Sequence, residues 1–300
     1  MKILLTGGTG FVGSHLLDRL RRQGHQIRLL VRHAVSGREP AGASGQAEMV
    51  GGDVVSGAGV QEAMQSCDAV IHLVGIIRET RGRTFDDVHH QGTRNVVAAA
   101  KRAGTQRLVH MSALGARANG VSGYQTSKWL AEEEVRRSGI SYTILRPSII
   151  FGPRDGFVSQ MVQLMKAVPL VRPVVGHGGY QFQPIYIANV VDCFVQALTV
   201  EKAKNRTIEL GGPEKLTLDR MLGEIAAVVG VRKFPLHIPF GLMYLNAALL
   251  GVILRQPPVT TDQLRMLREG STCDLGPMLA AFDLNLVGFR EGLQQYLGSG

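Results

Sequence analysis

Thr6-Gly7-Gly8-Thr9-Gly10-Phe11-Val12-Gly13 follows directly on a short apolar run, Ile3-Leu4-Leu5. Apolar residues then recur at helical spacing from Phe11 to Arg22. This order is typical of a strand, a tight turn and a helix. Glycine lets such a turn bring its backbone close to a phosphate, and the helix N-terminus adds free N–H groups and the positive end of a dipole. The stretch therefore predicts a dinucleotide-binding loop rather than a merely structural turn.

Short runs rich in Val, Ile and Leu alternate with amphipathic stretches through the first half of the 300-residue chain. The strand-like runs are Lys2–Thr6, Gln26–Val31, Glu48–Val50, Ala69–Val74, Arg107–Ser112, Tyr142–Arg146 and, later, Thr207–Leu210. The helix-like stretches between them are Phe11–Gln23, Gly59–Ser66, Thr84–Ala103 and Tyr124–Ser138. Near-continuous apolar strands joined by helices predict a parallel sheet covered on both faces. We expect an α/β fold, a doubly wound Rossmann sheet with its ligand at the carboxyl ends of the strands.

The pattern changes after Pro147, where prolines and glycines cluster and the helical stretches become short. We expect residues 1–150 to form the Rossmann domain, with 183–210 returning to it. Residues 151–182 and 211–300 then form a smaller, mainly helical substrate lobe.

One segment of that lobe, Leu236–Leu254, carries no charged residue apart from His237. It also contains Pro239 and two glycines, so it is too short and too broken to span a membrane. We predict a helix buried in the lobe. The alternative is a helix that lines an apolar substrate pocket or enters a membrane surface.

The net charge of +9 is spread along the chain without a block of five or six like charges. This pattern is not typical of a nucleic-acid-binding tail. The positive charge indicates either a solvated basic surface or a surface that attracts anionic ligands or an anionic membrane. The three cysteines are far apart and form no Cys-x-x-Cys, which indicates a reducing compartment and no zinc site. Met1 runs straight into the first strand-like run, so we expect a cytoplasmic protein, with a peripheral position at the inner face of a membrane as an extension.

A second group of residues points to proton transfer. Tyr124 and Lys128 lie four residues apart and share one face of a helix, and Ser112 lies twelve residues upstream of Tyr124 at the end of a strand-like run. An ammonium beside a phenol favours the phenolate, which lets the Tyr exchange a proton with a carbonyl or alcohol near neutral pH. The Ser hydroxyl is then placed to orient the substrate oxygen. A Tyr and a Lys at this spacing can also lie on the surface without a function. Together with the glycine loop, however, the three residues predict a catalytic site.

The residues after the second strand-like run bear on the choice of cofactor. An NAD site has a carboxylate there, about 20 residues past the glycine loop, which binds the ribose 2′-hydroxyl. This chain has Arg32 and His33 instead. A guanidinium accepts no hydrogen bond but pairs with a 2′-phosphate. We predict NADP, with NAD as the alternative if Arg32 is simply solvated.

Other polar residues give weaker signals. His89, His90 and His110 have no carboxylate or third histidine at metal-ligand spacing, so we expect local packing or a proton relay and no metal. Arg154 and Arg172 lie in the expected lobe. They could bind an anionic substrate there or simply lie on the surface, and the sequence favours neither role.

Together these motifs resemble the extended or atypical short-chain dehydrogenases/reductases, a family that includes NAD-dependent epimerases and dehydratases. The matching positions are Thr6–Gly13, Gly52-Asp53, Gly92-Thr93-x-Asn95, Ser112, Tyr124 with Lys128, and Arg146-Pro147 leading to Phe151-Gly152-Pro153. Further stretches resemble bacterial relatives of the accessory Rossmann subunit of respiratory complex I, namely Ile71–Glu79, His110–Ala116 and Glu209–Glu214.

The resemblance implies roles for individual residues. Gly7, Gly10 and Gly13 would hold the pyrophosphate, Asp53 and Val54 would touch the adenine, Val74 and Gly75 would flank the nicotinamide-side ribose, Lys128 would bond that ribose, and Pro147 and Ser148 would border the nicotinamide. Thr6, Phe11, Val12, Arg32, His33 and Leu73 complete the expected cofactor-binding set.

Two positions depart from the patterns of these relatives. Extended members usually have Asn where this chain has His89, and that Asn supports a proton relay through water and Lys. The subunit-like group often lacks the Tyr, whereas Tyr124 and Ser112 are both present here.

We expect an oxidoreductase that transfers a hydride between NADP(H) and a carbonyl or alcohol, with Tyr124 as acid/base. An apolar lobe suggests a hydrophobic substrate such as a quinone, an isoprenoid or a lipid. One alternative is an epimerase or dehydratase that retains its cofactor. Another is a catalytically silent, NADPH-holding subunit of a respiratory or quinone-related assembly. The sequence gives no oligomeric state.

Overall fold

In the described residues, six apolar runs of the first half and one later run form a seven-stranded sheet, with the strand order β11-β6-β5-β4-β1-β2-β3. The computed structural model describes residues 1–32, 47–80, 82–253 and 259–298, and its strands pair in parallel from β3 through to β6. The bounds are β1 Lys2–Thr6, β2 Gln26–Val31, β3 Ala47–Gly51, β4 Ala69–His72, β5 Arg107–Met111, β6 Ser141–Pro147 and β11 Arg206–Leu210. The predicted doubly wound α/β fold is confirmed.

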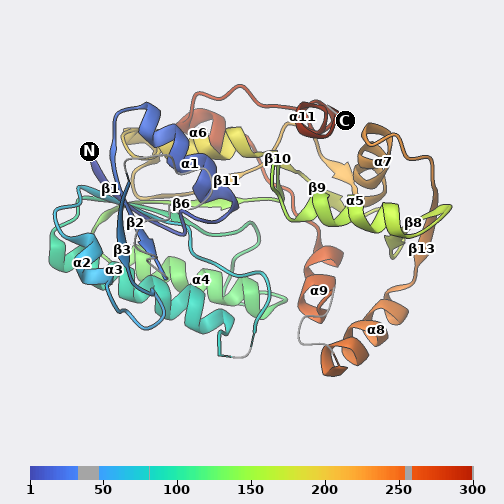
Figure 1. Ribbon diagram of the computed structural model, residues 1–300, viewed down its shortest axis with the longest axis horizontal. Coiled ribbons are helices and arrows are strands. Elements are labelled where there is room, and N and C mark those ends of the chain that lie inside the picture. Colours follow the sequence, from blue (N-terminus) through green and yellow to red (C-terminus); the bar gives the residue numbers. More distant parts are fainter. Residues whose placement is uncertain (33–46, 81, 254–258, 299–300) are drawn as a thin grey trace. The chain divides into compact units, whose positions relative to one another are not determined.

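Helices cover both faces of this sheet (Figure 1). Helices α1 (Phe11–Arg22) and α6 (Ile187–Gln196) lie on one face, where Arg19 and Asp192 form an ion pair of 2.9 Å. The other face carries α2 (Val60–Met64), α3 (Gly92–Ala103) and α4 (Gly123–Arg136). Each helix turns its apolar side to the strands, because strands buried on both faces need apolar partners on both faces. The core beneath α2, α3 and α4 includes Leu4, Val70, Val96, Leu108, Val135 and Ile144.

The direction of winding places the ligand-binding end of the sheet. From β1 the chain moves outward to β2 and β3, and it then crosses back to β4, β5 and β6 on the other side of β1. Strands β1 and β4 are neighbours in the sheet, and their last residues, Thr6 and His72, are paired. The loops that follow these two strands therefore run in opposite directions from the carboxyl edge of the sheet. This reversal is where doubly wound sheets bind their ligands.

One expected helix differs in type at its start. The stretch Thr84–Ala103 begins as a π-helix, η1 (Asp86–Gln91), and continues without a break into α3. A π-helix is rare and often accompanies a functional site. Two short helices complete this part of the chain, namely η2 Glu201–Ala203 and α10 Gly276–Ala281.

The described chain divides into two compact units, each built from three segments. The first unit comprises Met1–Arg146, Val190–Glu209 and Gly276–Leu284, and the second comprises Pro147–Asn189, Leu210–Leu275 and Asn285–Gly300. The sequence interpretation sets its boundaries at 150, 183 and 210, and it assigns all of 211–300 to the lobe. The structure instead groups Gly276–Leu284 with the sheet, a grouping for which the sequence carries no local signal.

In its described residues, the second unit contains three two-stranded ribbons and five helices. The ribbons pair β7 (Ile150–Phe151) with β10 (Ile185–Tyr186), β9 (Gln181–Phe182) with β12 (Leu216–Thr217), and β8 (Val171–Val175) with β13 (Phe234–Ile238). The helices are α5 Phe157–Ala167, α7 Leu218–Val228, α8 Phe240–Ile253, α9 Thr261–Glu269 and α11 Phe289–Leu297.

The apolar segment Leu236–Leu254 differs from its prediction. Its first residues belong to β13, and α8 begins only after Pro239. The side chains of Leu236, Leu242 and Leu245 are 50%, 51% and 56% exposed, so the predicted burial of this segment is wrong for these residues. Among the described residues, no helix is long and apolar enough to cross a membrane.

Candidate functional site: a nucleotide loop beside a Tyr–Lys pair

The loop Thr6–Gly13 joins β1 to α1 and is packed backbone to backbone. Gly7 has a φ of +77°, and a Cβ there would lie 3.1 Å from Leu73 C and Val74 N at the end of β4. A Cβ on Gly13 would lie 2.2 Å from the carbonyl oxygen of Gly7. Only glycine fits these two positions, because any side chain would collide with main-chain atoms that have nowhere to move. The loop is therefore held tightly between β4 and α1.

The start of α1 is suited to bind an anion. Gly10 is the N-cap and provides no side-chain cap, and the first turn of α1 contains no acidic residue. The first intrahelical bond is donated by Ser14 N–H to Gly10 O, so the N–H groups of Phe11, Val12 and Gly13 precede the helical bonding pattern. Free N–H groups and the positive end of the helix dipole together favour a phosphate. The glycine loop thus fits the pyrophosphate of a dinucleotide.

The loop after β3 forms the next part of the same edge. Asp53 accepts a hydrogen bond from Val55 N–H (3.0 Å) and forms an ion pair with Arg83. Burial raises the pKa of Asp53, but the Val55 bond and the charges of Arg83 and Arg32 outweigh burial and hold the pKa below its usual value. Arg32 is exposed directly after β2, and His33 lies outside the described residues. Two guanidinium groups therefore act on one carboxylate at this edge.

Sequence reasoning missed Arg83 as a site residue. It was only one of several arginines in a loop, and no motif marks it. Its position comes from a tight turn in which Thr80 and Arg83 exchange backbone hydrogen bonds of 3.1 and 3.0 Å.

The motif Gly92-Thr93-x-Asn95 supports this loop from α3. The Asn95 side-chain amide donates to the carbonyl oxygens of Val54 (2.8 Å) and Val55 (3.1 Å). A Cβ on Gly92 would lie 3.2 Å from a methyl group of Val54, so α3 approaches the loop closely. Asp53 and Val54 therefore lie in a loop whose backbone is held in place by α3.

The residues after β4 bring the glycine loop and the Tyr–Lys pair together. Leu73 and Val74 are the residues that a Cβ on Gly7 would meet, and a Cβ on the next residue, Gly75, would lie 3.0 Å from Lys128 Nζ. Lys128 is 2% exposed and donates to Met111 O at 3.0 Å. Burial lowers its pKa to about 8, against an opposing effect of Glu132. A Lys ammonium that is easily deprotonated therefore lies beside the end of β4.

Tyr124 lies in the first turn of α4, one turn before Lys128. Its ring contacts Phe85 and His89, with centroid distances of 5.8 and 5.4 Å and edge-to-face geometry. Burial raises the pKa of Tyr124 to about 12. Desolvation of the phenol is the cause of this shift, so Tyr124 is neutral at neutral pH.

His89 is held by hydrogen bonds at both ring nitrogens. Ile76 N–H donates to Nε2 (3.0 Å), and Nδ1 lies 2.8 Å from Ser127 Oγ. The Ser127 hydroxyl donates its one proton to the main-chain carbonyl oxygen of Tyr124 (2.9 Å). The hydroxyl oxygen of Ser127 therefore accepts a hydrogen bond from His89 Nδ1–H. Burial lowers the pKa of His89 to about 2. Of the two expected roles, this geometry favours packing over a proton relay, because neither nitrogen is free.

The hydroxyl of Ser112 donates to the carboxylate of Glu132 at 2.5 Å. Glu132 is fully buried in α4 and also accepts from Arg146 (2.8 and 2.7 Å) and Arg136 (2.5 Å). The only proton of the Ser112 hydroxyl is therefore directed at Glu132, and its oxygen offers an acceptor to any other group.

Two expected cofactor residues, Pro147 and Ser148, belong to the second unit. The Ser148 hydroxyl interacts with Ser271, at 3.1 Å from its carbonyl oxygen and 3.0 Å from its hydroxyl. All the other expected site residues that the structure describes lie in the first unit.

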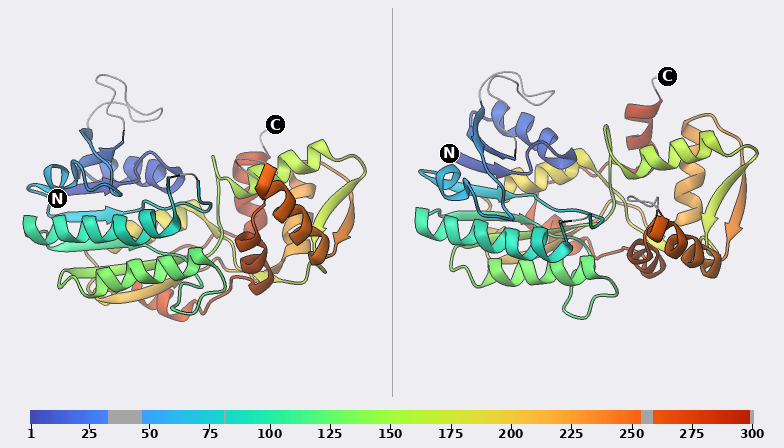
Figure 2. Two further views of the ribbon diagram at one scale, coloured as in Figure 1. Left: turned by 90° about the horizontal axis from the view of Figure 1, so that it is seen from below. Right: turned by 60° about the horizontal axis from the view of Figure 1, so that its bottom comes forward.

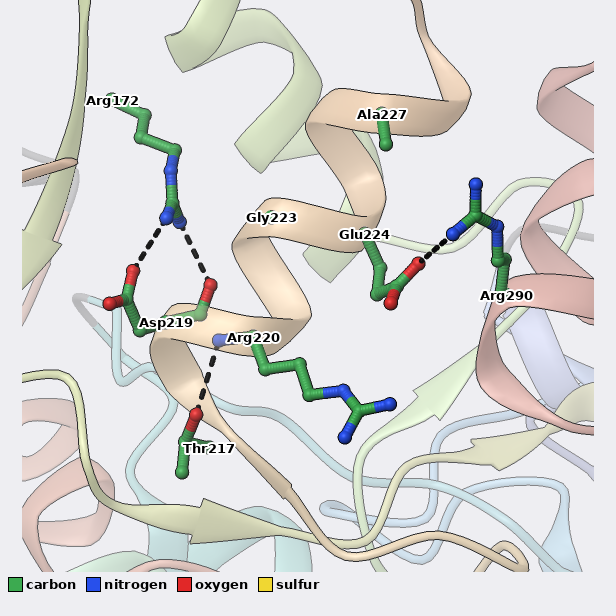
Figure 3. Close-up of a pocket in the computed structure, with 8 residues that line it drawn as sticks. All are labelled: Arg172, Thr217, Asp219, Arg220, Gly223, Glu224, Ala227 and Arg290. Atoms are coloured by element: carbon green, nitrogen blue, oxygen red, sulfur yellow. Dashed lines mark hydrogen bonds and ion pairs between the residues drawn. The ribbon is translucent and has the colours of Figure 1, made fainter. Parts of the chain in front are cut away.

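The second unit contains an open pocket of about 410 Å³ beside α7 (Figure 3). Arg172 is bound there by the carboxylate (2.7 Å) and the carbonyl (2.9 Å) of Asp219, and Arg290 pairs with Glu224 at 3.2 Å. Arg172, one of the two arginines considered for an anionic substrate, is thus engaged within the unit. The polar lining does not fit a hydrophobic substrate.

Comparison with known proteins agrees with this geometry. The model of the NAD dependent epimerase/dehydratase family matches residues 3–211. The chain is 30% identical over 263 residues to mouse NADH dehydrogenase (ubiquinone) 1 alpha subcomplex subunit 9, covering 86% of this chain and 69% of the mouse protein. It is 32% identical over 169 residues to the ceramide reductase of Caulobacter vibrioides, covering 56% of this chain and 52% of that enzyme.

A solved structure of similar fold is the UDP-glucose 4-epimerase of Thermotoga maritima, with a TM-score of 0.77 and 19% identity. The match covers 99% of this chain and 97% of the epimerase. The family model spans more than half of the chain and includes the glycine loop, the loop after β3 and the Tyr–Lys pair. The chain belongs to the NAD dependent epimerase/dehydratase family.

Proposed function

We propose that the protein is an NADP(H)-dependent reductase of a carbonyl group on a hydrophobic substrate such as a lipid, an isoprenoid or a quinone. One observation carries the proposal. A Cβ on Gly7 of the glycine loop would lie 3.1 Å from Leu73 and Val74, and a Cβ on Gly75 would lie 3.0 Å from Lys128 Nζ, so the nucleotide loop and the lysine of the Tyr–Lys pair both lie close to Leu73–Gly75. The similarity to a ceramide reductase supports a lipid carbonyl or alcohol as the reacting group.

The residues present fit a dinucleotide. The free N–H groups of Phe11, Val12 and Gly13 would hold the pyrophosphate, the loop of Asp53 and Val54 would hold the adenine, and Leu73–Gly75 with Lys128 would hold the nicotinamide-side ribose. Pro147 and Ser148 remain proposed neighbours of the nicotinamide. When bound, NADPH supplies the hydride.

The protein supplies the proton. A carbonyl carbon that receives a hydride leaves negative charge on its oxygen, and Tyr124, with a pKa of about 12, donates the phenolic proton to that oxygen. The Lys128 ammonium, with a pKa of about 8, stabilises the resulting phenolate by its charge. Ser112 is proposed as a positioning residue, because its proton is directed at Glu132.

The first test replaces Tyr124 with phenylalanine, which removes the proton donor and keeps the ring. We expect NADPH oxidation with carbonyl substrates to fall at least about 100-fold, because general acid catalysis is worth roughly that much, while NADPH affinity stays the same. In the wild type, reduction should also slow as pH rises through about 8, where Lys128 loses its charge. Substrate screening by NADPH absorbance measures both effects, and unchanged turnover in Tyr124→Phe would overturn the assignment.

A preference for NADP is proposed from Arg32 and Arg83, whose charges both act on Asp53. A 2′-phosphate beside two guanidinium groups gains charge-assisted hydrogen bonds that a 2′-hydroxyl does not. We expect Arg32→Asp and Arg83→Gln each to weaken NADPH binding about tenfold, with little change for NADH. Calorimetric titration with both nucleotides is the measurement, and exposed Arg102→Gln is the control. Equal losses for NADPH and NADH would refute the 2′-phosphate argument.

A second candidate is a nucleotide-holding subunit of a membrane-associated respiratory assembly, with no turnover. The engaged hydroxyl of Ser112, the fixed His89 and the similarity to a complex I subunit favour it. Stoichiometric NADPH that survives purification, and that no carbonyl or quinone oxidises, would support this candidate against the reductase.

A further inference from the structure

The ribbon formed by β8 and β13 has one covered face and one open face. Arg172 and Val174 of β8 share a face, on which Arg172 pairs with Asp219 of α7 and Val174 is fully buried. His237, the register partner of Val174, turns to the same side and lies 3.6 Å from Asp219. Side chains alternate along a strand, so Phe234 and Leu236 point to the opposite face.

That opposite face is exposed. Phe234 is 79% exposed and Leu236 is 50% exposed, although both are large apolar side chains. Within the second unit, α5 and α7 pack on one side of the ribbon, and Figure 2 shows no described element of this unit over the other side. An apolar face without a cover is unusual for a soluble domain and marks an interaction site.

The turn before β8 adds a strained residue to this face. Leu170 has a φ of +60° and is 78% exposed, and its carbonyl oxygen accepts from Phe234 N–H at 3.1 Å. The left-handed region is unfavourable for a bulky residue, and exposure of a leucine is a second unfavourable feature. Strain retained at an exposed residue next to an open apolar face points to function rather than to stability.

Helix α8 continues the apolar surface. It follows β13 after Pro239, and its Phe240 ring packs edge to face on Tyr180 at 5.4 Å. None of its fourteen residues is charged, and Leu242 and Leu245 are 51% and 56% exposed. A helix that is apolar all round needs a protein interior or a lipid environment. At about 1.5 Å per residue it is too short to span a bilayer.

Cations flank this surface. Arg232 is exposed just before β13, and Arg265 and Arg268 are exposed on α9, which packs against α8. From Val231 to Glu269 the sequence contains five Lys and Arg but only two acidic residues, Asp262 and Glu269. Basic residues beside an apolar surface complement anionic lipid headgroups. A protein partner would instead require hydrogen bonds, and α8 offers few side chains for them, mainly Tyr244 and Asn246.

We propose that Leu170, Phe234, Leu236 and two exposed leucines of α8, Leu242 and Leu245, form a docking surface for an anionic bilayer. The apolar side chains enter the boundary between headgroups and acyl chains, and the flanking arginines contact anionic headgroups. The surface goes beyond the nucleotide chemistry and does not depend on it.

The test is flotation of the full-length protein with phosphatidylcholine vesicles, with and without about one third phosphatidylglycerol. We expect binding to the anionic vesicles and weaker binding to the neutral ones. Phe234→Glu and Leu236→Glu should each reduce binding about tenfold, because a carboxylate must be moved out of water. Leu279→Glu is the matched control, since Leu279 is 48% exposed in the first unit. In Phe234→Trp, vesicles should shift the tryptophan emission to the blue, and brominated lipids should quench it.

Several outcomes would overturn the proposal. The wild type could fail to bind anionic vesicles, or Leu279→Glu could lose as much binding as Phe234→Glu. Light scattering could instead show a dimer that Phe234→Glu dissociates, with no vesicle binding, in which case a second copy covers this face. NADPH affinity is measured in parallel and should not change in Phe234→Glu. Loss of nucleotide binding with intact vesicle binding would contradict only the proposed reductase.

Discussion

At the scale of single residues, burial decides the chemistry of this site more than the identity of neighbours. Lys128 and Tyr124 have the spacing of a catalytic pair, but desolvation moves the pKa of Lys128 down to about 8 and that of Tyr124 up to about 12. Both shifts favour the uncharged form, as expected for groups removed from water. At neutral pH the phenol of Tyr124 is therefore protonated, and the ammonium of Lys128 is close to its pKa.

Buried histidines make stability depend on pH. Burial lowers the pKa of His72 to about 3 and that of His89 to about 2, whereas an unfolded chain has about 6.5. Below about pH 6.5 the unfolded state binds protons that the folded state does not, so stability is lost as pH falls, by about 1.4 kcal/mol per pH unit for each such histidine.

We therefore expect the free energy of unfolding, from urea titrations, to decrease between pH 6.5 and 5. The slope of this dependence gives the number of protons taken up on unfolding, and His89→Asn should lower that number by about one, because one buried imidazole is removed. An unchanged slope in that variant would mean that His89 is not buried as a neutral group.

At the scale of elements, α4 links the site to three strands. Ser122 caps the helix by accepting from Gln125 N–H, and one side of the helix then presents Tyr124, Lys128 and Glu132. Glu132 gathers Ser112 after β5, Arg146 of β6 and Arg136, which also contacts Thr207 of β11. A buried charge network on the next turn of the helix therefore holds the turn that carries Tyr124 and Lys128.

Removal of Glu132 should be costly, because it leaves Arg146 without its buried partner. We expect Glu132→Ala to lower the free energy of unfolding by about 3 kcal/mol, as for other broken buried pairs. Glu133→Ala on the same helix removes two partly exposed ion pairs, with Arg136 and Arg137, and should cost at most about 1 kcal/mol. Urea denaturation of both variants gives the comparison, and equal costs would mean that the Glu132 network contributes no more than a surface pair.

At the scale of the whole molecule, the chain passes between its two units several times. The first unit includes most of β11 and of α6, which lie in the segment Val190–Glu209. It also includes α10, which lies in the segment Gly276–Leu284. Neither unit is a contiguous piece of sequence. A fragment that ends near residue 150 therefore lacks parts of the first unit.

A fragment of residues 1–146 tests this point. It lacks β11, the neighbour of β6, and it lacks α6, which covers one sheet face with α1. An unpaired edge beside an uncovered apolar face should prevent cooperative folding. We expect circular dichroism in urea to show no cooperative transition for the fragment and a clear one for the full chain. A cooperative transition in the fragment would show that the first segment folds alone.

The sequence by itself determined the doubly wound sheet, the order of its strands and helices, the glycine loop and the Tyr–Lys pair. These features follow from the local periodicity of apolar residues and from the spacing of the glycines and of Tyr124 and Lys128, so they are visible without long-range contacts. Tertiary structure alone decided that Arg83 reaches Asp53, that His89 is fixed through Ser127, that Ser112 faces Glu132, and that Phe234, Leu242 and Leu245 are exposed. Each of these depends on which distant residues meet and how far water is excluded, and such information is absent from local patterns of sequence.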